Sequence, residues 1–339
     1  MANPPTLPST TPIHNLLQIG MYNTISRIVH AGVYLGLPDH VENGPKSAFQ
    51  IAKEIKADPD SVYRLMRALS SQGIMREEDE FGVFSKTPTS TLLTNTDKGL
   101  MRSGILTLCG DLQYKAHLNL VKTIQTGIPQ SDFGYEGGFW EALLRSDPDT
   151  ILNFNKYMTL SSILFAPTLV KSTSFSGMKI VCDLGGSQGM LIREILKNNP
   201  NVQKGINFDL PTIIEYKKSN EDNNTRYEEV AGDFFDSVPF ADAYTLKFVL
   251  HDWNDDKCKI ILKNIENANA NAKIIIYDSI CDSKNESKFS PIYDIKMKHF
   301  LNGRERSPQE WINLAESCNY KIVEFNSSVT PGLIIMVHK

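Results

Sequence analysis

A histidine and two acidic residues in the C-terminal half of the chain have the types and spacing of a proton-transfer site. His251 follows an apolar run at residues 243–250, which we expect to be a strand with the histidine at its carboxyl end. Asp278 ends the next predicted strand, and Glu305 lies in a polar loop further on. A carboxylate on one imidazole nitrogen fixes the tautomer and leaves the other nitrogen free to take a proton. The set therefore predicts a general base, although a histidine taken alone is more often structural.

A glycine-containing loop precedes this set. Residues 180–184 form a short apolar run, and Gly-Gly-Ser-Gln-Gly follows at 185–189. Glycines let the backbone approach a ligand closely, and the start of the helix that follows offers unpaired N–H groups. The same loop is also a common strand-to-helix turn, so by itself it does not define a binding site.

Three acidic residues, Asp183, Asp209 and Asp233, stand at the ends of successive predicted strands. Asp209 lies about 20 residues beyond the loop, where a carboxylate accepts both hydroxyls of a ribose. Asp233 is placed to accept a hydrogen bond from the amino group of a purine. The three carboxylates predict a nucleoside site at the carboxyl edge of a sheet. NAD remains possible from this geometry, because its ribose hydroxyls also need a carboxylate acceptor.

The elements that must position these residues belong to a mostly parallel α/β sheet. From Met178 onward, β-rich apolar runs alternate with helical patterns, which predicts strand–helix–strand units. Two final runs, at 320–327 and 333–339, are separated by Pro331-Gly332 and predict a closing antiparallel pair. The helical patterns cover residues 190–197, 255–268 and 308–317.

The N-terminal part of the chain has a different pattern. A long apolar helix face over residues 13–37 needs a partner. Residues 47–93 predict helix, turn, helix and hairpin, with a tight turn at Phe81-Gly82, which is a winged-helix pattern. A winged helix can bind DNA, but the segment from Lys46 to Lys86 holds seven basic and seven acidic residues, a poor surface for DNA. We therefore expect a structural or dimerising module, followed by mostly helical residues 100–172.

The composition argues against several classes of partner. A net charge of -4 and a pI near 6.0 give no attraction for nucleic acid or anionic membranes. The five cysteines are odd in number and lack a C-x-x-C pair, so neither a disulfide framework nor a zinc site is predicted. The start of the chain lacks a signal-peptide pattern, and no run of about 18 apolar residues occurs. We expect a cytoplasmic protein.

The ordered set of motifs resembles the family of small-molecule S-adenosylmethionine-dependent O-methyltransferases, typified by plant caffeate and isoflavone enzymes and acetylserotonin methyltransferase. Each motif is modest, whereas their order and spacing over nearly the whole chain are specific. The motifs are FNKYM at 154–158, DLGGSQG at 183–189, FDLP at 208–211, GDFF at 232–235, LKFVLHDWNDDKC at 246–258 and NGRERS at 302–307.

This resemblance implies a fold and a set of binding residues. The implied fold is a Rossmann-like methyltransferase sheet at residues 101–339, with a helical substrate-binding segment, after a mainly helical winged-helix dimerisation domain at residues 1–100. It also implies a homodimer, S-adenosyl-L-methionine as cofactor and no metal. Implied cofactor contacts are Asp183, Gly185 and Gly189 at the methionine end, Asp209 at the ribose, Asp233 and Phe234 at the adenine, and Lys247 closing over it.

The implied reaction transfers a methyl group to a hydroxyl of a small phenolic or polyketide-type molecule, with His251 as base beside Asp278 and Glu305. Ser187 and Gln188 depart from the family's smaller loop residues, and Phe234 stands where methionine is common. We expect cofactor binding to survive these changes. Methionine and aromatic side chains often clamp flat substrates. The candidate acceptor contacts are therefore Phe154, Met158, Trp253, Met297 and Phe300, and each of them could equally belong to the hydrophobic core.

Other functions fit the same residues. A relative of this fold can bind the cofactor without transferring its methyl group, in decarboxylation, hydroxylation or pericyclic chemistry. A ligand-sensing winged-helix regulator is a second alternative, which the balanced charge of residues 47–93 disfavours. The sequence does not name the acceptor or distinguish an oxygen from a nitrogen acceptor.

Overall fold

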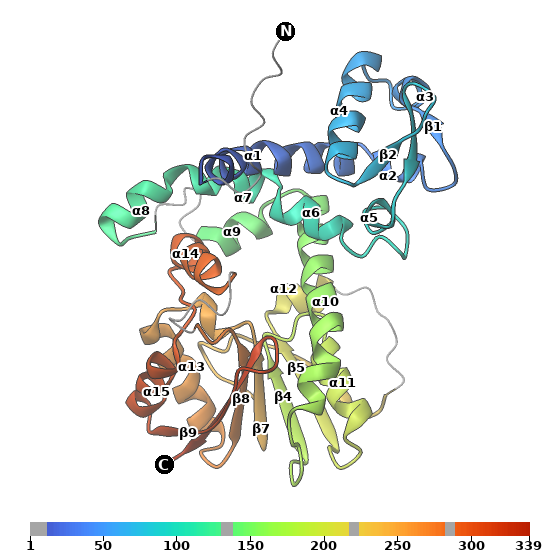
Figure 1. The fold of residues 1–339 in the computed structure, drawn as a ribbon. Coiled ribbons are helices and arrows are strands. Elements are labelled where there is room, and N and C mark those ends of the chain that lie inside the picture. The colour runs from blue at the N-terminus through green and yellow to red at the C-terminus, as the bar shows by residue number, and fades with distance from the viewer. Residues whose placement is uncertain (1–11, 130–137, 217–223, 282–288) are drawn as a thin grey trace. The chain divides into compact units, whose positions relative to one another are not determined.

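A computed structural model describes residues 12–129, 138–216, 224–281 and 289–339 of the chain (Figure 1). Residues 1–11, on which the expectation about a signal peptide depends, lie outside the described residues. Contacts between Cα atoms divide the chain into two compact units. The N-terminal unit comprises Met1–Tyr114 and Pro148–Tyr157, and the C-terminal unit comprises Lys115–Asp147 and Met158–Lys339.

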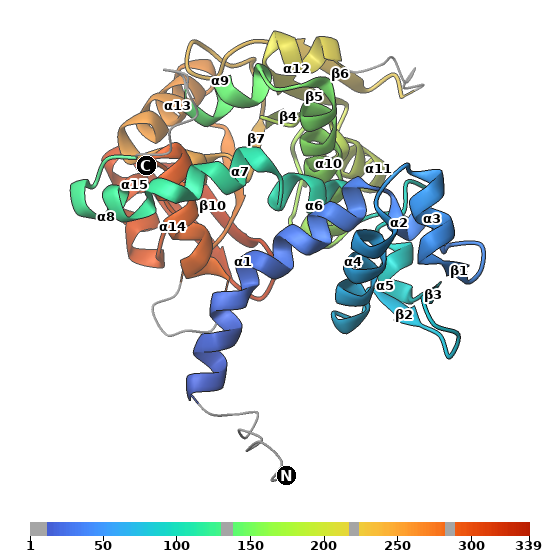
Figure 2. The same ribbon diagram turned by 90° about the horizontal axis from the view of Figure 1, so that it is seen from above.

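The N-terminal unit contains the predicted winged helix. Gly82 has a left-handed φ of 75° and completes the turn between the two hairpin strands, and Asp58 caps the second helix of the motif by accepting from the N–H of Ser61. The C-terminal part of the first helix packs against other helices of this unit, whereas its N-terminal part extends beyond them (Figure 2). The apolar side chains of that N-terminal part are exposed. The elements of this unit are α1 (Pro12–Tyr34), α2 (Leu37–His40), β1 (Lys46–Ser47), α3 (Ala48–Glu54), α4 (Pro59–Ser71), β2 (Met75–Glu77), β3 (Val83–Lys86), α5 (Pro88–Thr91) and α6 (Arg102–Leu108).

The C-terminal unit is built on a seven-stranded sheet in the order β6-β5-β4-β7-β8-β10-β9. The first five strands in this order are parallel, and β10 pairs antiparallel with both β8 and β9, which confirms the predicted closing pair. The strands are β4 (Ile180–Leu184), β5 (Lys204–Asp209), β6 (Tyr227–Ala231), β7 (Ala243–Lys247), β8 (Lys273–Asp278), β9 (Tyr320–Asn326) and β10 (Gly332–His338).

Two layers of helices cover the sheet, because alternate residues of a strand point to opposite faces. Cys182 and Ile274 pack with α13 and α15 on one face, whereas Val181 and Ile275 pack with α10 and α11 on the other (Figure 1). The remaining elements are α7 (Asp111–Ala116), η1 (His117–Asn119), α8 (Leu120–Thr126), α9 (Gly138–Leu144), α10 (Pro148–Lys171), α11 (Met190–Asn198), α12 (Pro211–Tyr216), η2 (Leu250–Asp252), α13 (Asp255–Ala268), α14 (Ser290–Leu301) and α15 (Pro308–Ser317).

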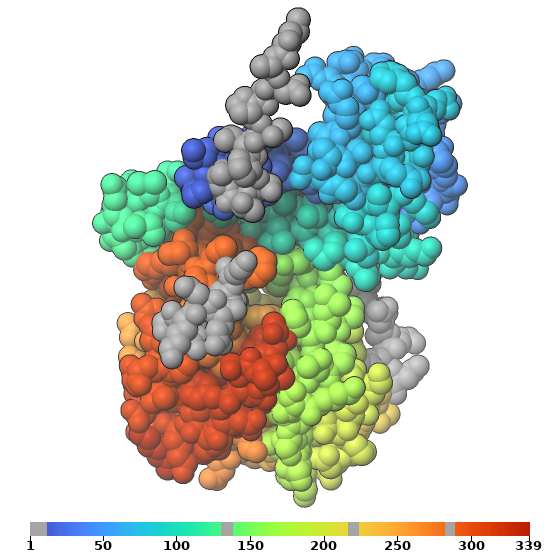
Figure 3. All heavy atoms as spheres, viewed as in Figure 1, coloured from blue at the N-terminus to red at the C-terminus, as the bar shows by residue number. Residues whose placement is uncertain are grey.

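The strand order places the predicted site at one edge of the sheet. From β4 the chain moves outward through β5 and β6, then returns to form β7 on the other side of β4. Ligands of open α/β sheets bind beyond the carboxyl ends of the strands at such a switch point. The C-terminal residues, orange to red, and the light-green residues of α10 share one face of this unit (Figure 3). Among the described residues, no helix combines the length and apolar character needed to cross a bilayer.

Candidate active site

His251 lies on a short 3-10 turn beyond β7, not at the end of the strand itself. The strand predicted over 243–250 stops at Lys247, because Phe248 adopts a left-handed φ of 55°. This conformation is strained for a residue with a side chain. It redirects the chain into η2, and the ring of Phe248 lies 5.4 Å from the imidazole of His251. His251 therefore lies on the turn that follows β7, beyond the last residue of the strand.

The loop that carries Glu305 packs directly against this turn. The N–H of Arg304 donates to the carbonyl oxygen of His251 at 2.8 Å. A Cβ atom on Gly303 would lie 2.0 Å from that same oxygen, so only glycine permits this approach. This backbone contact brings Glu305, which lies 54 positions further along the sequence, next to the imidazole of His251.

Two buried carboxylates face Nδ1 of His251. Oε1 of Glu305 lies 2.7 Å from Nδ1, and Oδ1 of Asp278 lies 3.6 Å from it. The other oxygen of Asp278 accepts from the backbone N–H of His251 at 3.2 Å. Asp278 is 0% and Glu305 3% exposed. Glu305 is therefore the closer partner of the ring, and a proton held between it and Nδ1 leaves Nε2 as the basic nitrogen.

Asp252 lies on the opposite side of the imidazole, with Oδ1 3.3 Å from Nε2. Burial would lower the pKa of His251, but the charges of Asp278, Asp252 and Glu305 outweigh it and raise the pKa to about 10. Burial has the opposite effect on a carboxyl group, because it disfavours the charged form. It raises the pKa of Asp278 to about 7 and that of Asp252 to about 6. His251, Asp278 and Asp252 therefore keep their protons at pH values where isolated groups would lose them. Sequence reasoning missed Asp252, although its position directly after the predicted base was a signal.

Arg306, also missed, holds the turn and the loop together. Its buried guanidinium donates to the carbonyl oxygens of Leu250 and Trp253, each at 3.0 Å. It also makes two hydrogen bonds, of 2.7 and 3.1 Å, to one carboxylate oxygen of Asp255. Since these acceptors flank His251 in sequence, Arg306 positions the base without touching the reacting atoms.

The glycine loop packs closely against the side chains of the neighbouring strands. Gly185 and Gly189 have left-handed φ values of 69° and 72°, and α11 begins directly after Gly189. A Cβ atom on Gly186 would lie 2.1 Å from Oδ1 of Asn207 and 2.7 Å from Oδ2 of Asp183. Ser187 keeps the turn with a φ of 49°, at the cost of backbone strain.

The three acidic strand ends follow one another along the sheet edge, because β4, β5 and β6 are neighbours. Asp183 accepts from the hydroxyl of Thr245 at 2.7 Å. Asp209 accepts from the N–H of Ser187 at 2.8 Å, which ties the second strand end to the glycine loop. Asp233 accepts from the N–H of Phe235 at 2.8 Å. Close-packed glycines beside a row of carboxylates fit a ligand with a ribose and a charged tail.

Lys247 ends β7 between the ends of two other strands. Burial lowers the pKa of its ammonium group, and the negative charges of Asp183 and Asp278 oppose that shift. Its Nζ lies 4.8 Å from the ring of Phe248. β4 and β5 separate β7 from β6, which leads to Asp233. Lys247 therefore lies nearer to Asp183 and Asp278, on the strands that flank β7, than to the strand that leads to Asp233.

The candidate acceptor contacts fall in different environments. Trp253 packs edge-on against Phe235 at 4.7 Å and lies 6.3 Å from Phe234, so it belongs to an aromatic group on the predicted adenine side. Phe300 packs edge-on against His117 at 4.9 Å. The other three candidates are Met297, which is buried on α14, Met158 in the C-terminal unit, and Phe154 in the N-terminal unit.

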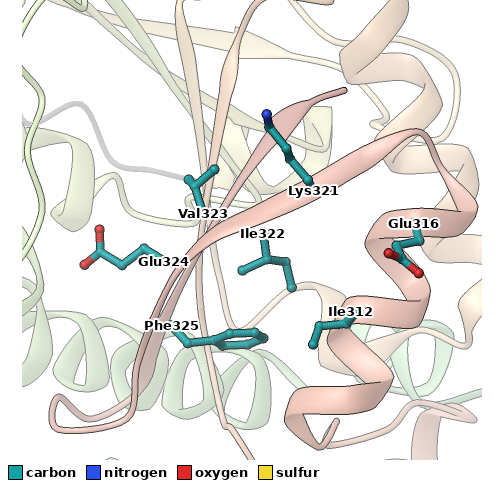
Figure 4. A pocket seen from close by; sticks show the side chains of 7 residues that line it. All are labelled: Ile312, Glu316, Lys321, Ile322, Val323, Glu324 and Phe325. Atoms are coloured by element: carbon teal, nitrogen blue, oxygen red, sulfur yellow. The ribbon is translucent and has the colours of Figure 1, made fainter.

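A pocket of about 360 Å³ lies at the far edge of the sheet, between α15 and the edge strand β9 (Figure 4). None of its lining residues belongs to the predicted site. Its lining residues are Ile312, Glu316, Lys321, Ile322, Val323, Glu324 and Phe325.

The fold and these residues define a Rossmann-like methyltransferase. A family model described as the O-methyltransferase domain matches residues 117–321, and one described as the O-methyltransferase dimerisation domain matches residues 20–96. The chain therefore belongs to the O-methyltransferase family, which confirms the resemblance. The family also gives the methyl donor, S-adenosyl-L-methionine.

Several known proteins are similar to this chain over nearly its whole length. O-methyltransferase 7 of Dictyostelium discoideum is 35% identical over 96% of this chain and 94% of its own. Des-methyl DIF-1 methyltransferase A of the same organism is 33% identical over 91% of this chain and 88% of its own. The solved structure of the mitomycin 7-O-methyltransferase MmcR has a TM-score of 0.89 and 24% identity, covering 96% of this chain and 98% of that one.

Proposed function

We propose that the chain methylates a hydroxyl of a small phenolic or polyketide-type molecule, with His251 as the general base. The 2.7 Å contact between Nδ1 of His251 and Oε1 of Glu305 carries this proposal. It directs the opposite nitrogen, Nε2, toward the acceptor, and the 3.3 Å contact of Nε2 with Asp252 is long enough for an acceptor hydroxyl to replace.

The carboxylates around His251 change the energetics of this proton transfer. A phenol titrates near 10 and a free imidazole near 6.5, so transfer between them is uphill by about 5 kcal/mol. The three carboxylates raise the pKa of His251 to about 10. This brings the acidity of the imidazolium close to that of a phenol and removes most of the uphill cost of the transfer, and the ring must first lose its own proton to act as a base.

The cofactor supplies a sulfonium-bound methyl group when bound. Asp183, Gly185 and Gly189 would shape the site of its methionine end, and Asp209 would accept from the ribose hydroxyls. Asp233 and Phe234 would hold the adenine, and Lys247 would close over it. In this proposal His251 removes the hydroxyl proton as the acceptor oxygen attacks, and Glu305 and Asp278 stabilise the resulting imidazolium.

We also propose that the protein acts as a cytoplasmic homodimer, with residues 1–100 as the dimerising domain and 101–339 as the catalytic domain. The match to a dimerisation domain over residues 20–96 supports the pairing. So does the apolar face of α1, where Ile13, Leu16 and Leu17 are 62–69% exposed in the single chain. The five free cysteines fit a reducing compartment.

Incubation with S-adenosylmethionine and a panel of phenols tests this function. We expect a methyl ether and S-adenosylhomocysteine to form in equal amounts, and His251→Ala to lower turnover by roughly 10²- to 10⁴-fold with cofactor affinity nearly retained. Turnover of the variant at the wild-type rate would show that His251 is not the base. Product without demethylated cofactor would instead favour a non-methylating enzyme of this fold.

A further inference from the structure

Arg193, on the first turn of α11, folds back over the end of the glycine loop. Long side chains on a helix point toward the start of that helix, and Nη1 of Arg193 donates to the carbonyl oxygen of Gln188 at 2.5 Å. The backbone N–H of the same residue donates to the carbonyl oxygen of Gly189 at 3.1 Å. Arg193 thus binds two consecutive carbonyl groups where the loop becomes the helix.

A cation at this place is unfavourable by itself, because the N-terminus of a helix carries a partial positive charge. Two side chains on one face of β6 stabilise it. The guanidinium carbon of Arg193 lies 4.0 Å from the ring centre of Tyr227, a cation–π contact, and Nη2 lies 3.9 Å from Oε1 of Glu229. The hydroxyl of Tyr227 donates to the same oxygen of Glu229 at 2.6 Å. We call these three residues the Arg193 cluster.

The Arg193 cluster packs directly against the last glycine of the loop. A Cβ atom on Gly189 would collide with the hydroxyl of Tyr227 and would lie 2.9 Å from Nη1 of Arg193. Glycine at this position therefore serves two ends, since it takes the left-handed φ of 72° and leaves room for the cluster.

The loop needs support from outside because Ser187 holds a strained left-handed φ of 49°. Two side chains of β5 fix the peptide groups on either side of this residue. Oδ2 of Asp209 accepts from the N–H of Ser187 at 2.8 Å, and Nδ2 of Asn207 donates to its carbonyl oxygen at 3.0 Å. The next carbonyl group, that of Gln188, is the one that Arg193 holds.

We propose that Arg193 is a positioning residue for the cofactor, which keeps the backbone of Gln188 and Gly189 in the shape that the methionine end of S-adenosylmethionine requires. This inference rests on the function proposed above, in which the glycine loop forms that part of the site. Arg193 acts through the loop backbone. A loop that is already ordered before binding lowers the free-energy cost of binding, without a further contact to the ligand.

The affinity for S-adenosylhomocysteine, measured by titration calorimetry well below the melting temperature of each variant, tests the inference. We expect Arg193→Met to raise Kd about 5- to 20-fold. Arg193→Lys should raise it less, because an ammonium group still donates a hydrogen bond but lacks the planar face that lies on Tyr227. Tyr227→Leu should also raise Kd, because it removes that ring. The KM for S-adenosylmethionine should rise in Arg193→Met, whereas kcat at saturating cofactor should stay near the wild-type value.

Arg226 offers a matched control at the other end of α11. Its guanidinium donates to the carbonyl oxygens of Leu196, Val202 and Asn199 at 2.6, 2.7 and 3.2 Å. Arg226→Met should lower the melting temperature, because three carbonyl groups lose a donor, but should leave Kd unchanged. An unchanged Kd in Arg193→Met, or an equal rise in Arg226→Met, would overturn the inference and leave the proposed function standing. Cofactor binding without methylation of any hydroxyl would refute that function alone, because these affinities are measured without an acceptor.

Discussion

Nδ1 of His251 and Oε1 of Glu305 lie 2.7 Å apart, although 54 positions separate the two residues in the chain. The contact depends on a glycine at 303, where any side chain would collide with the carbonyl oxygen of His251. Glu305 itself is almost completely buried, so its charge is poorly screened by water. The imidazole is thereby oriented, and its protonated form stabilised, by the same residue.

Replacing Glu305 by glutamine keeps an acceptor near Nδ1 but removes the charge. We expect kcat to fall about 10- to 100-fold, because a neutral amide stabilises the imidazolium less than a carboxylate does. Cofactor affinity, measured by titration calorimetry, should change little. The exposed Glu316 offers a matched control, and a loss of kcat in Glu316→Gln as large as that in Glu305→Gln would contradict the role assigned to Glu305.

The pH dependence of kcat/KM should report the raised pKa of His251. The imidazole must be unprotonated to accept a proton, and the pKa of His251 is raised to about 10. The midpoint of the rise in kcat/KM toward a neutral phenol should therefore lie at a pH well above 6.5, the pKa of a free imidazole. Asp252→Asn removes a negative charge beside Nε2, lowers the pKa of His251, and should move this rise to lower pH. A rise centred at or below 6.5 in the wild-type protein would refute the stabilising effect of the carboxylates.

Gly186 is the position in the cofactor loop where space is most limited. Gly186→Ala would place its Cβ against Asn207 and Asp183, so the loop must shift. We expect the Kd for S-adenosylhomocysteine to rise by more than about tenfold, a loss of about 1.4 kcal/mol. Equilibrium dialysis measures the change, and thermal unfolding checks that the sheet remains intact. Unaltered affinity would show that the loop backbone does not form the cofactor site.

Arg306 should matter for stability as well as for activity. Arg306→Met leaves the carbonyl oxygens of Leu250 and Trp253 without their buried donor. We expect the free energy of unfolding to fall by about 2 to 4 kcal/mol, because buried acceptors then lose their hydrogen bonds. Urea titration measures this loss. Arg306→Lys should recover only part of it, since one ammonium cannot reproduce the planar set of donors.

Metal independence can be examined directly, because His251, Asp278 and Glu305 each offer a ligand atom and these atoms lie within 4.8 Å of one another. We expect kcat to be the same after exhaustive treatment with a chelator, since the imidazole already has a carboxylate partner on Nδ1. Activity that disappears with chelation and returns with a divalent ion would contradict the proposed mechanism.

The fold class, and the edge of the sheet that carries the candidate site residues, were predictable from local sequence patterns. Asp209 and Asp278 each end a parallel strand, and Asp183 lies one residue before the end of another. Parallel strands bring their carboxyl ends to one edge of the sheet, whichever helices connect them. The glycine loop and the alternation of apolar runs are equally local features. Local patterns of this kind are visible in a sequence because they depend on the period of the backbone.

Asp278 and Glu305 were expected beside His251 from the sequence, whereas Asp252 at Nε2 and the contacts of Arg306 emerged from the folded structure. The left-handed turn at Phe248, the backbone approach at Gly303 and the clamp of Arg306 together turn His251 toward Glu305 on one side and Asp252 on the other. These contacts join residues that lie far apart in the sequence, so they depend on how distant segments pack and cannot be read from a local pattern.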